Sequence, residues 1–322
     1  MNKIFPENLN ILITGGAGFI GSNAVETLLD HNEITVMDNL RNVDDRFIKQ
    51  FMGRKNFHFK KLDITRMSNF SGLKAFDLIL HLAANSDVRG GSGDPETDFN
   101  INALGTFNVL EFMRKTDTKR IMFASSSTVY GEASVLPTPE DYGPYLPISS
   151  YGASKMAGEG FISAYSHYYG ITGVIFRFAN IVGKNSTHGV IFDFINKLRK
   201  NSHELEILGD GSQRKSYLHV NDCIGSMFHV NSILRKTDVF NLGNHETTSV
   251  LKIADFVIRE MGLNNVEKKL TGGPEGRGWK GDVKLAQLSI DKISATGWKN
   301  MYSSDRSVEI AVKEALAQID PN

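Results

Sequence analysis

Short runs of β-branched and apolar residues alternate with longer stretches of helical periodicity in the first half of the chain. The runs are predicted strands, and they cover residues 9–14, 34–38, 57–62, 76–83, 120–125 and 172–178. The stretches are predicted helices, and they cover residues 19–30, 94–115 and 151–169. Such an alternation is typical of βαβ units. It therefore predicts an α/β fold with a doubly wound parallel sheet.

The pattern changes after Asn180, where the segments become shorter. Turns are predicted at 209–212 and 272–274, and further helices at 190–199, 222–234, 249–261 and 306–319. We therefore predict a domain of residues 1–180 and a smaller C-terminal lobe of residues 181–322. The boundary is soft and the lobes are interleaved, because lobes of this kind often lend strands back to the main sheet.

Composition narrows the classes of partner. The 322 residues are enough to bury a substantial core, and 36 basic residues balance 36 acidic ones. No run of Lys and Arg indicates a nucleic-acid or membrane-surface partner. An anionic substrate would therefore be held by a few placed cations. The nine histidines include no H-E-x-x-H pattern, so no metal site is expected, and His81 is interpreted as a core residue at a strand end.

Three features of the sequence favour a cytoplasmic location. The single cysteine, Cys223, excludes an internal disulfide and is interpreted as a small core residue. Residues 1–10 lack a signal-peptide pattern, and no apolar stretch reaches the roughly 18 residues of a membrane span.

The glycine-rich segment T-G-G-A-G-F-I-G at 14–21 follows the first predicted strand and opens a helix. Gly15, Gly18 and Gly21 allow a tight turn, close approach of the backbone to a pyrophosphate and close helix–strand packing. The helix N-terminus then offers unpaired N–H groups to phosphates. Asp38, at the end of the second predicted strand, is expected to accept hydrogen bonds from the adenosine ribose, and a carboxylate there favours NAD over NADP.

A second group of residues combines a candidate catalytic base with a neighbouring cation. Tyr151 and Lys155 lie four residues apart on a predicted helix and therefore on one face of it. A phenol with a pKa of about 10 is a poor base near neutral pH. A neighbouring ammonium and an oxidised nicotinamide ring are expected to lower that pKa. The hydroxyl-rich segment 125–128 ends the fifth strand, where open α/β sheets bind ligands.

These motifs together resemble the extended short-chain dehydrogenase/reductases, and within them most closely the prokaryotic UDP-galactose (UDP-glucose) 4-epimerases. The resemblance covers nearly the whole chain. It rests on TGGAGFIGS at 14–22, DNL at 38–40, HLAAN at 81–85, SSSTVYG at 125–131, YGASK at 151–155, RFANIVG at 177–183, HGVIFDFI at 188–195, GDGSQRKSYLHV at 209–220 and GRGWKGDVK at 276–284.

The resemblance implies a reversible hydride transfer. Tyr151 would take the proton of the sugar 4-hydroxyl, Lys155 would hold the cofactor ribose, and Ser126 would contact the same 4-oxygen with support from Thr128. The bound 4-keto sugar would then turn and take the hydride back on its other face. The resemblance also implies an NAD site, whose residues are Gly15, Gly18, Phe19, Ile20, Gly21, Asp38, Asn39, Leu40, Asp63, Ile64, Leu82, Ala83, Ala84, Asn102, Tyr151 and Lys155.

The same resemblance assigns substrate contacts to both halves of the chain. The residues concerned are Ser126, Asn180, Val190, Lys215, Tyr217, Arg277 and Arg89. Lys215 departs from the arginine that is common in the family, so a point charge replaces a fork of donors, and Arg214 is a candidate to compensate. Ala286 falls near the position of a gating tyrosine. Its small side chain predicts tolerance of an N-acetyl group on the sugar.

The resemblance also sets this chain apart from relatives with other activities. Simple reductases of the fold usually bind NADP, against which Asp38 argues. Sugar 4,6-dehydratases carry an Asp-Glu pair where this chain has Ser127 and Thr128, and uronic acid decarboxylases keep a glutamate at the position of Thr128. UDP-glucuronate 4-epimerases share the serine-rich motif and remain open, as does a UDP-N-acetylhexosamine 4-epimerase. A nucleotide-sensing scaffold is disfavoured because both Tyr151 and Lys155 are present. The family's pairing of two long helices across a two-fold axis predicts a homodimer.

Overall fold

The chain forms two compact units in a computed structural model that describes residues 4–87, 93–273, 276 and 285–319. The first unit comprises residues 1–132, 140–178 and 224–241, and the second comprises 133–139, 179–223 and 242–322. The change of unit between 178 and 179 lies next to the expected boundary at 180. The segment 224–241 returns to the first unit and supplies an edge strand to its sheet.

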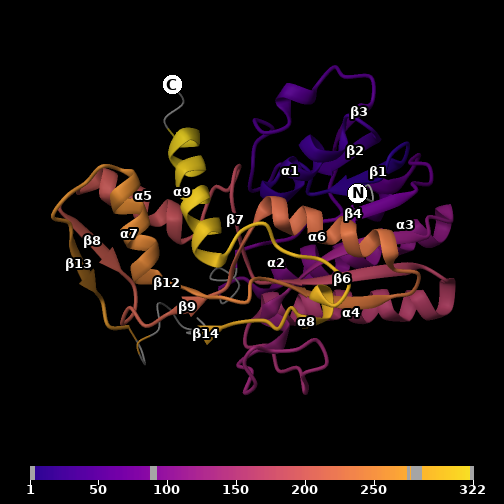
Figure 1. Cartoon of the computed structure of the whole chain (residues 1–322). Coiled ribbons are helices and arrows are strands. Elements are labelled where there is room, and N and C mark those ends of the chain that lie inside the picture. Colours follow the sequence, from indigo (N-terminus) through magenta and orange to yellow (C-terminus); the bar gives the residue numbers. More distant parts are fainter. Residues whose placement is uncertain (1–3, 88–92, 274–275, 277–284, 320–322) are drawn as a thin grey trace. The chain divides into compact units, whose positions relative to one another are not determined.

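A seven-stranded sheet with the order β11-β6-β5-β4-β1-β2-β3 forms the centre of the first unit (Figure 1). Its strands are β1 (Asn10–Thr14), β2 (Glu33–Asp38), β3 (Phe57–Lys61), β4 (Leu78–His81), β5 (Arg120–Ser126), β6 (Thr172–Phe178) and β11 (Asp238–Leu242). The six strands β1 to β6 pair in parallel. The order of strands reverses between β1 and β4, and ligands of such sheets bind at this switch point, beyond the carboxyl ends of the strands. The doubly wound α/β fold is thereby confirmed.

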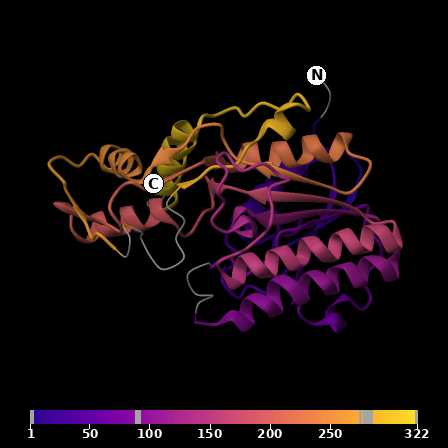
Figure 2. The same ribbon diagram turned by 90° about the horizontal axis from the view of Figure 1, so that it is seen from below.

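Helices cover both faces of this sheet. They are α1 (Phe19–Leu28), α2 (Pro95–Asp98), α3 (Gly105–Thr116), α4 (Ser150–Tyr169) and α6 (Val220–Ile233), with the short turns η1 (Lys49–Phe51), η2 (Met67–Phe70) and η5 (Ser127–Tyr130). In Figure 2, α3 and α4 lie side by side on one face, and α6 lies on the other. Buried residues of β5 such as Ile121 and Phe123 pack in one core cluster with Val109 and Phe112 of α3. The α3 and α4 layer is therefore fixed against the strand that carries the hydroxyl-rich segment.

The predicted helix at 94–115 is interrupted by a wide turn. Between α2 and α3, residues Phe99–Leu104 form a π-helical segment, η4. A π turn adds a residue to the helix and changes which side chains face inward, and such turns are frequent at functional sites. Here the turn contains Asn102, whose buried side chain reaches Ser154 of α4.

The second unit combines short strands with an independent helical core. The strands form three small sheets: β7 (Asn180–Val182) with β10 (Tyr217–His219); β9 (Arg214–Lys215) with β12 (Thr248–Ser249) and β14 (Leu285–Ala286); and β8 (Glu204–Ile207) with β13 (Glu267–Leu270). The helices are α5 (Val190–Lys200), α7 (Val250–Glu260), α8 (Asp291–Ser294) and α9 (Ser304–Ile319). Apolar faces of α5, α7 and α9 meet in a core of their own. None of the helices in the described part of the chain is long and apolar enough to cross a membrane.

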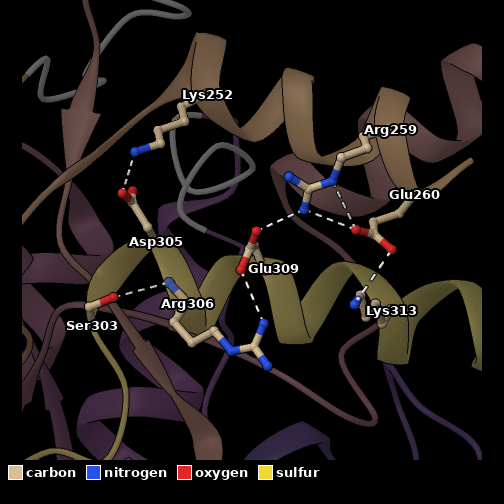
Figure 3. A network of polar contacts seen from close by, with 8 residues as sticks. All are labelled: Lys252, Arg259, Glu260, Ser303, Asp305, Arg306, Glu309 and Lys313. Atoms are coloured by element: carbon tan, nitrogen blue, oxygen red, sulfur yellow. Dashed lines mark hydrogen bonds and ion pairs between the residues drawn. The ribbon is translucent and has the colours of Figure 1, made fainter. Parts of the chain in front are cut away.

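An exposed network of ion pairs joins α7 to α9 on the outside of this core (Figure 3). We call it the α7–α9 network, and its members are Lys252, Arg259, Glu260, Ser303, Asp305, Arg306, Glu309 and Lys313. Glu309 accepts hydrogen bonds from Arg259 at 2.7 Å and from Arg306 at 3.1 Å. Lys252 binds Asp305 at the other end of the same helix pair. The network lies at the surface, so water and salt screen its charges.

Candidate active site

The glycine-rich loop between β1 and α1 closes so tightly that side chains are excluded from it. Gly15 has a φ of +70°, and a Cβ atom built on it would lie 2.7 Å from the backbone nitrogen of Ala83. A Cβ on Gly21 would lie 2.3 Å from the carbonyl oxygen of Gly15. Gly18 precedes α1 as its cap, and no side chain caps the helix or places an acid in its first turn. The first N–H groups of α1 are thus available to an anion at the switch point of the sheet.

Asp38 lies at the carboxyl end of β2 and is tied to this loop. Its carboxylate accepts hydrogen bonds from the backbone N–H of Ala17 at 3.1 Å and of Leu40 at 2.9 Å. Burial raises the pKa of Asp38, while these two hydrogen bonds act in the opposite direction. The acid predicted from the sequence therefore lies next to the glycine-rich loop.

Asn39 and Asp63 extend the same edge of the sheet. The Asn39 amide donates to Asp63 at 3.1 Å, and the Thr65 N–H donates to the other carboxylate oxygen at 2.9 Å. Burial acts to raise the pKa of Asp63, but these hydrogen bonds act against burial, and the pKa is lowered. Ile64 differs from its neighbour, because its side chain is buried in the core against Gly105 of α3.

The remaining predicted cofactor residues fall into two groups. Partly buried residues surround the glycine loop and the end of β4, and they are Phe19, Ile20, Leu40, Leu82, Ala83 and Ala84. Asn102 is instead hydrogen-bonded to other residues of the protein through both its side-chain oxygen and its side-chain nitrogen. Its oxygen accepts from the Asn85 N–H at 2.8 Å, and its nitrogen donates to the Ser154 hydroxyl at 3.0 Å. Asn102 thus holds the segment after β4 against the helix that carries Tyr151.

His81 is a buried core residue, as expected from the sequence. Its Nδ1 lies 2.6 Å from the Thr14 hydroxyl, and its Nε2 lies 3.0 Å from the Thr106 hydroxyl. Because Thr106 donates to the Asn102 carbonyl at 2.6 Å, its oxygen accepts from Nε2, and Nδ1 accepts from Thr14. Burial and the nearby Lys155 lower the pKa of His81 to about 3, so the ring is neutral.

Ser126, Thr128 and Tyr151 meet at the end of β5. The Ser126 oxygen receives two hydrogen bonds from Thr128, one from its N–H at 3.2 Å and one from its hydroxyl at 3.0 Å. These two bonds fill the lone pairs of Ser126, so its own proton is directed to the Tyr151 oxygen, with which it shares a hydrogen bond. Thr128 therefore acts on Tyr151 through Ser126.

Lys155 lies on the same buried face of α4, one turn after Tyr151. Its Nζ donates to the Ala124 carbonyl of β5 at 2.8 Å and lies 5.9 Å from the centre of the Tyr151 ring. Burial lowers the pKa of Lys155 to about 8, against the opposing influence of Glu159 and Asp98. Catalytic amines and phenols are commonly placed in environments that shift their pKa in this way.

Burial dominates the electrostatics of Tyr151 in the protein alone. Burial raises the pKa of the phenol to about 12, the hydrogen bond from Ser126 opposes the rise, and Asp98 adds to it. The expected lowering of this pKa depends on Lys155 together with an oxidised nicotinamide ring, and in the protein alone the cost of burying a phenolate dominates. Any further lowering must come from charge that a bound molecule brings.

Asp98 and Ser150, which lie near Tyr151, were not predicted as site residues from the sequence. Asp98 is fully buried, and its carboxylate accepts from the Asn85 amide at 2.8 Å and from the Ser150 hydroxyl at 2.5 Å. Ser150 is the first residue of α4, so Asp98 fixes the start of the helix that carries Tyr151 and Lys155. Nothing in the local pattern distinguishes Asp98 from an ordinary acid in the first turn of a helix.

In the second unit, the described candidates for substrate binding lie on neighbouring short strands. Asn180 of β7 is directly opposite Tyr217 of β10, and Lys215 of β9 is directly opposite Ala286 of β14. Val190 is the first residue of α5. Arg214 donates twice to Thr247, at 3.2 and 3.1 Å, so its guanidinium is engaged there. Arg89 and Arg277, the other two candidates, lie outside the described residues.

Comparisons with known proteins agree with this arrangement. The model of the NAD dependent epimerase/dehydratase family matches residues 11–243. The chain is similar to a putative UDP-glucose 4-epimerase of Methanocaldococcus jannaschii, with 35% identity over 314 residues and 96% of each chain covered. It is also similar to a UDP-glucuronate 4-epimerase of Thermodesulfobacterium geofontis, with 29% identity over 324 residues, which cover 96% of this chain and 97% of the relative.

A solved structure extends the likeness to three dimensions. The crystal structure of a UDP-galactose 4-epimerase superposes with a TM-score of 0.86 at 38% identity, covering 97% of this chain and 100% of that one. The seven-stranded sheet of the first unit fits the same family. This chain belongs to the NAD-dependent epimerase/dehydratase family.

Proposed function

We propose that the enzyme is an isomerase that inverts C4 of a UDP-hexose, interconverting UDP-galactose and UDP-glucose through a 4-keto sugar. The family and the similarity to 4-epimerases support the reaction type. The observation that carries the proposal is the hydrogen-bonded series from Thr128 to Ser126 to Tyr151 at the carboxyl end of β5. It places a base and a proton donor together, and it contains no carboxylic acid.

Each of these residues has a role in moving one proton. Tyr151 removes the proton of the sugar 4-hydroxyl and later returns it. Ser126 donates to the Tyr151 oxygen and thereby stabilises the phenolate form. Lys155 adds positive charge on the same face of α4 and is a donor for a ribose hydroxyl.

The residues at the switch point fit NAD. The glycine loop excludes side chains where a pyrophosphate would approach, and Asp38 is placed to accept from a ribose hydroxyl. Asn39, Leu40, Asp63 and the backbone of residues 82–84 are the further contacts that we propose. When bound, NAD supplies the acceptor for the C4 hydride and the positive charge that lowers the pKa of Tyr151.

The same segment argues against a dehydratase or a decarboxylase. Expelling a C6 hydroxyl or removing a C5 proton needs an acid or base at the positions of Ser127 and Thr128. Thr128 instead donates its hydroxyl to Ser126. Two carboxylates are buried nearby, but Asp98 is bonded to Asn85 and Ser150, and Glu159 is paired with Arg177.

Substrate binding is assigned to residues of the second unit. We propose that Lys215 holds the diphosphate as a point charge, and that Asn180, Val190 and Tyr217 contact the nucleotide or the sugar. Arg277 and Arg89 remain proposed contacts on the basis of the sequence alone. A nucleoside diphosphate needs cations with hydrogen-bonding reach, which Lys215 provides.

The experiment that tests the function is an assay without added NAD. The purified protein is incubated with UDP-galactose, UDP-glucose, UDP-N-acetylglucosamine and UDP-glucuronate, and the products are separated. We expect C4 epimers of the first two and about a 10²-fold or larger loss of turnover in Tyr151→Phe. Denaturation should release NAD. Full turnover in Tyr151→Phe would exclude the mechanism.

The small side chain of Ala286 favours a second class of substrate, in which the sugar carries an N-acetyl group. Its side chain ends at Cβ, and it lies opposite Lys215, the proposed diphosphate ligand. We propose that the enzyme also accepts UDP-N-acetylhexosamines. Ala286→Tyr should reduce turnover of the N-acetyl sugars while sparing UDP-galactose, and equal loss with both would contradict the assignment. UDP-glucuronate is the further alternative, favoured by the 29% identical relative, and the assay above distinguishes it.

We also propose that two copies of the chain pair through α3 and α4. Large side chains are exposed along these helices and the π turn before them: Phe99, Leu104, Phe161, Tyr168 and Tyr169. Phe161 packs on Phe107 of α3, so the apolar surface is continuous across both helices. Light scattering should give the mass of a dimer, and Phe161→Glu should give a monomer. A monomeric mass for the unaltered chain would exclude the pairing.

A further inference from the structure

The most buried ion pair in the described part of the chain joins the helix of the proposed catalytic residues, α4, to strand β6. Glu159 lies on α4, one turn after Lys155, and Arg177 lies on β6. Both side chains are almost completely buried. The guanidinium donates two hydrogen bonds to the carboxylate, from Nε to Oε1 at 3.0 Å and from Nη2 to Oε2 at 2.7 Å. Nothing in the reaction itself requires this pair.

The pair is bonded to both ends of the segment that carries Ser126 and Thr128. At the start of the segment, the Ser125 hydroxyl donates to Glu159 Oε1 at 2.5 Å. At its end, Arg177 Nη1 donates to the Tyr130 hydroxyl at 2.8 Å, and Tyr130 donates onward to Asn241 at 2.8 Å. The segment 125–130 is therefore anchored on each side of the hydroxyl that contacts Tyr151.

These anchors join three elements that must keep a fixed geometry. Glu159 belongs to the helix of Tyr151 and Lys155, Ser125 belongs to β5, and Arg177 lies opposite Ser125 in the β5–β6 register. A buried bidentate pair holds its partners rigidly, since each donor has a defined direction. A shift of about 1 Å between Ser126 and Tyr151 is enough to cost up to about 10²-fold in rate.

We propose that Glu159 and Arg177 are positioning residues that hold Ser126 against Tyr151, acting through Ser125 and Tyr130. This inference rests on the proposed epimerase function. It assigns to Ser125 and Tyr130 a role in proton transfer that neither performs by direct contact. The charged groups that act on Tyr151 and Lys155 include Asp98 from α2 and Glu159 from α4. A neutral change at Ser125 or Tyr130 leaves both carboxylates in place.

The test uses Ser125→Ala and Tyr130→Phe, which remove one anchor each without removing a charge. Tyr145→Phe is the matched control. Its ring faces the same guanidinium at 4.7 Å, and its hydroxyl bonds to the Glu140 carbonyl, outside the segment 125–130. We expect kcat to fall about tenfold in each test variant with KM nearly unchanged, and to stay within about twofold in Tyr145→Phe.

The pH profile separates positioning from a general loss of stability. Loss of the Ser126 hydrogen bond raises the pKa of Tyr151, so the acid limb of kcat should move to higher pH in Ser125→Ala and Tyr130→Phe only. The inference is overturned if the two variants keep the kcat and the profile of the unaltered chain, or if Tyr145→Phe loses as much.

A second readout does not depend on turnover. The tyrosinate absorbance of each variant is titrated, and the same variant carrying Tyr151→Phe is subtracted, which isolates the ionisation of Tyr151. If no sugar nucleotide is converted, the proposed function fails, yet a shifted Tyr151 midpoint in Ser125→Ala still supports the positioning role. An unshifted midpoint in both test variants rejects it.

Discussion

Charged side chains cluster in each of the two units, but the two clusters are built differently. In the first unit, Arg177 and Glu159 are buried and bonded to Ser125 and Tyr130. In the second unit, the α7–α9 network lies at the surface, where successive ion pairs connect two helices (Figure 3). Both clusters have short, well-directed contacts, so geometry alone does not distinguish them.

The difference lies in what happens when one partner is lost. A surface ion pair gains little, because water and salt already solvate its charges. A buried pair that loses one partner leaves a charge in an apolar surrounding, at a cost of several kcal/mol. Although burial acts to lower it, the pKa of Arg177 is raised by Glu159, so the guanidinium stays charged. The buried cluster therefore gives a fixed geometry, and the exposed one gives a modest addition to stability.

Glu159→Gln should show the largest effect. It leaves the Arg177 guanidinium buried without a carboxylate, and we expect the free energy of unfolding to fall by about 3–5 kcal/mol. Urea unfolding measures the change. Glu260→Gln on α7 is the matched control in the exposed network and should cost less than about 1 kcal/mol. Equal losses in the two variants would contradict the comparison.

The second prediction concerns Lys155, a buried cation that touches a carbonyl rather than a carboxylate. Its pKa is lowered from 10.5 to about 8 in the folded protein. Between these values the unfolded chain holds the extra proton, so stability should rise with pH across the window from 8 to 10.5. Across this window the free energy of unfolding should increase by about 3 kcal/mol. Unfolding measured over this range should lose the rise in Lys155→Met, and an unchanged slope would contradict the lowered pKa.

Much of the first unit could be predicted from the sequence, because the spacing of apolar residues indicates which face of each strand or helix is buried. β6 lies at the predicted residues 172–178, and α4 begins one residue before the predicted 151. The glycine loop and Asp38 also lie together as predicted, since the loop chemistry is encoded in consecutive residues. All the strands after β6, from β7 to β14, were missed, including β11 at the edge of the central sheet. Two-residue strands such as β9, β12 and β14 show no alternation of apolar and polar residues.

The interior of the site was not predictable in the same way. Glu159 follows Lys155 by four residues, which suggests an exposed helix pair, yet its partners Ser125 and Arg177 come from other elements. The π turn at Phe99–Leu104 has no signature in the apolar pattern. Burial raises the pKa of Tyr151 in the protein alone, and burial depends on the whole fold, which the spacing of Tyr151 and Lys155 does not report.

A third prediction removes the buried charges together. Replacing a buried pair by apolar residues is often neutral for stability, because no unpaired charge remains. In Glu159→Leu/Arg177→Met the Ser125 and Tyr130 hydroxyls lose partners, so we expect a net loss of about 2 kcal/mol, smaller than in Glu159→Gln alone. Turnover should nevertheless remain low, because the anchors of segment 125–130 are gone. Recovery of both stability and full kcat would show that the pair does not position Ser126.

A small effect is expected for Glu309→Gln in the α7–α9 network. Hydrogen bonds from Arg259 and Arg306 lower the pKa of Glu309, but all three side chains are reached by water. The variant should lose less than about 1 kcal/mol of unfolding free energy, because the gain of an exposed pair is offset by solvation.

Salt separates the two clusters in one further measurement. Debye screening at high ionic strength should remove most of the Glu309→Gln difference and leave the Glu159→Gln difference nearly unchanged, since buried pairs are screened far less. Lys313→Gln, whose ammonium lies 3.8 Å from Glu260, is the control for a weak exposed contact and should have almost no effect at any salt concentration. A Glu309→Gln loss that is large and insensitive to salt would show that the exposed network, like the buried pair, holds charges away from water, and the contrast between the two units would then disappear.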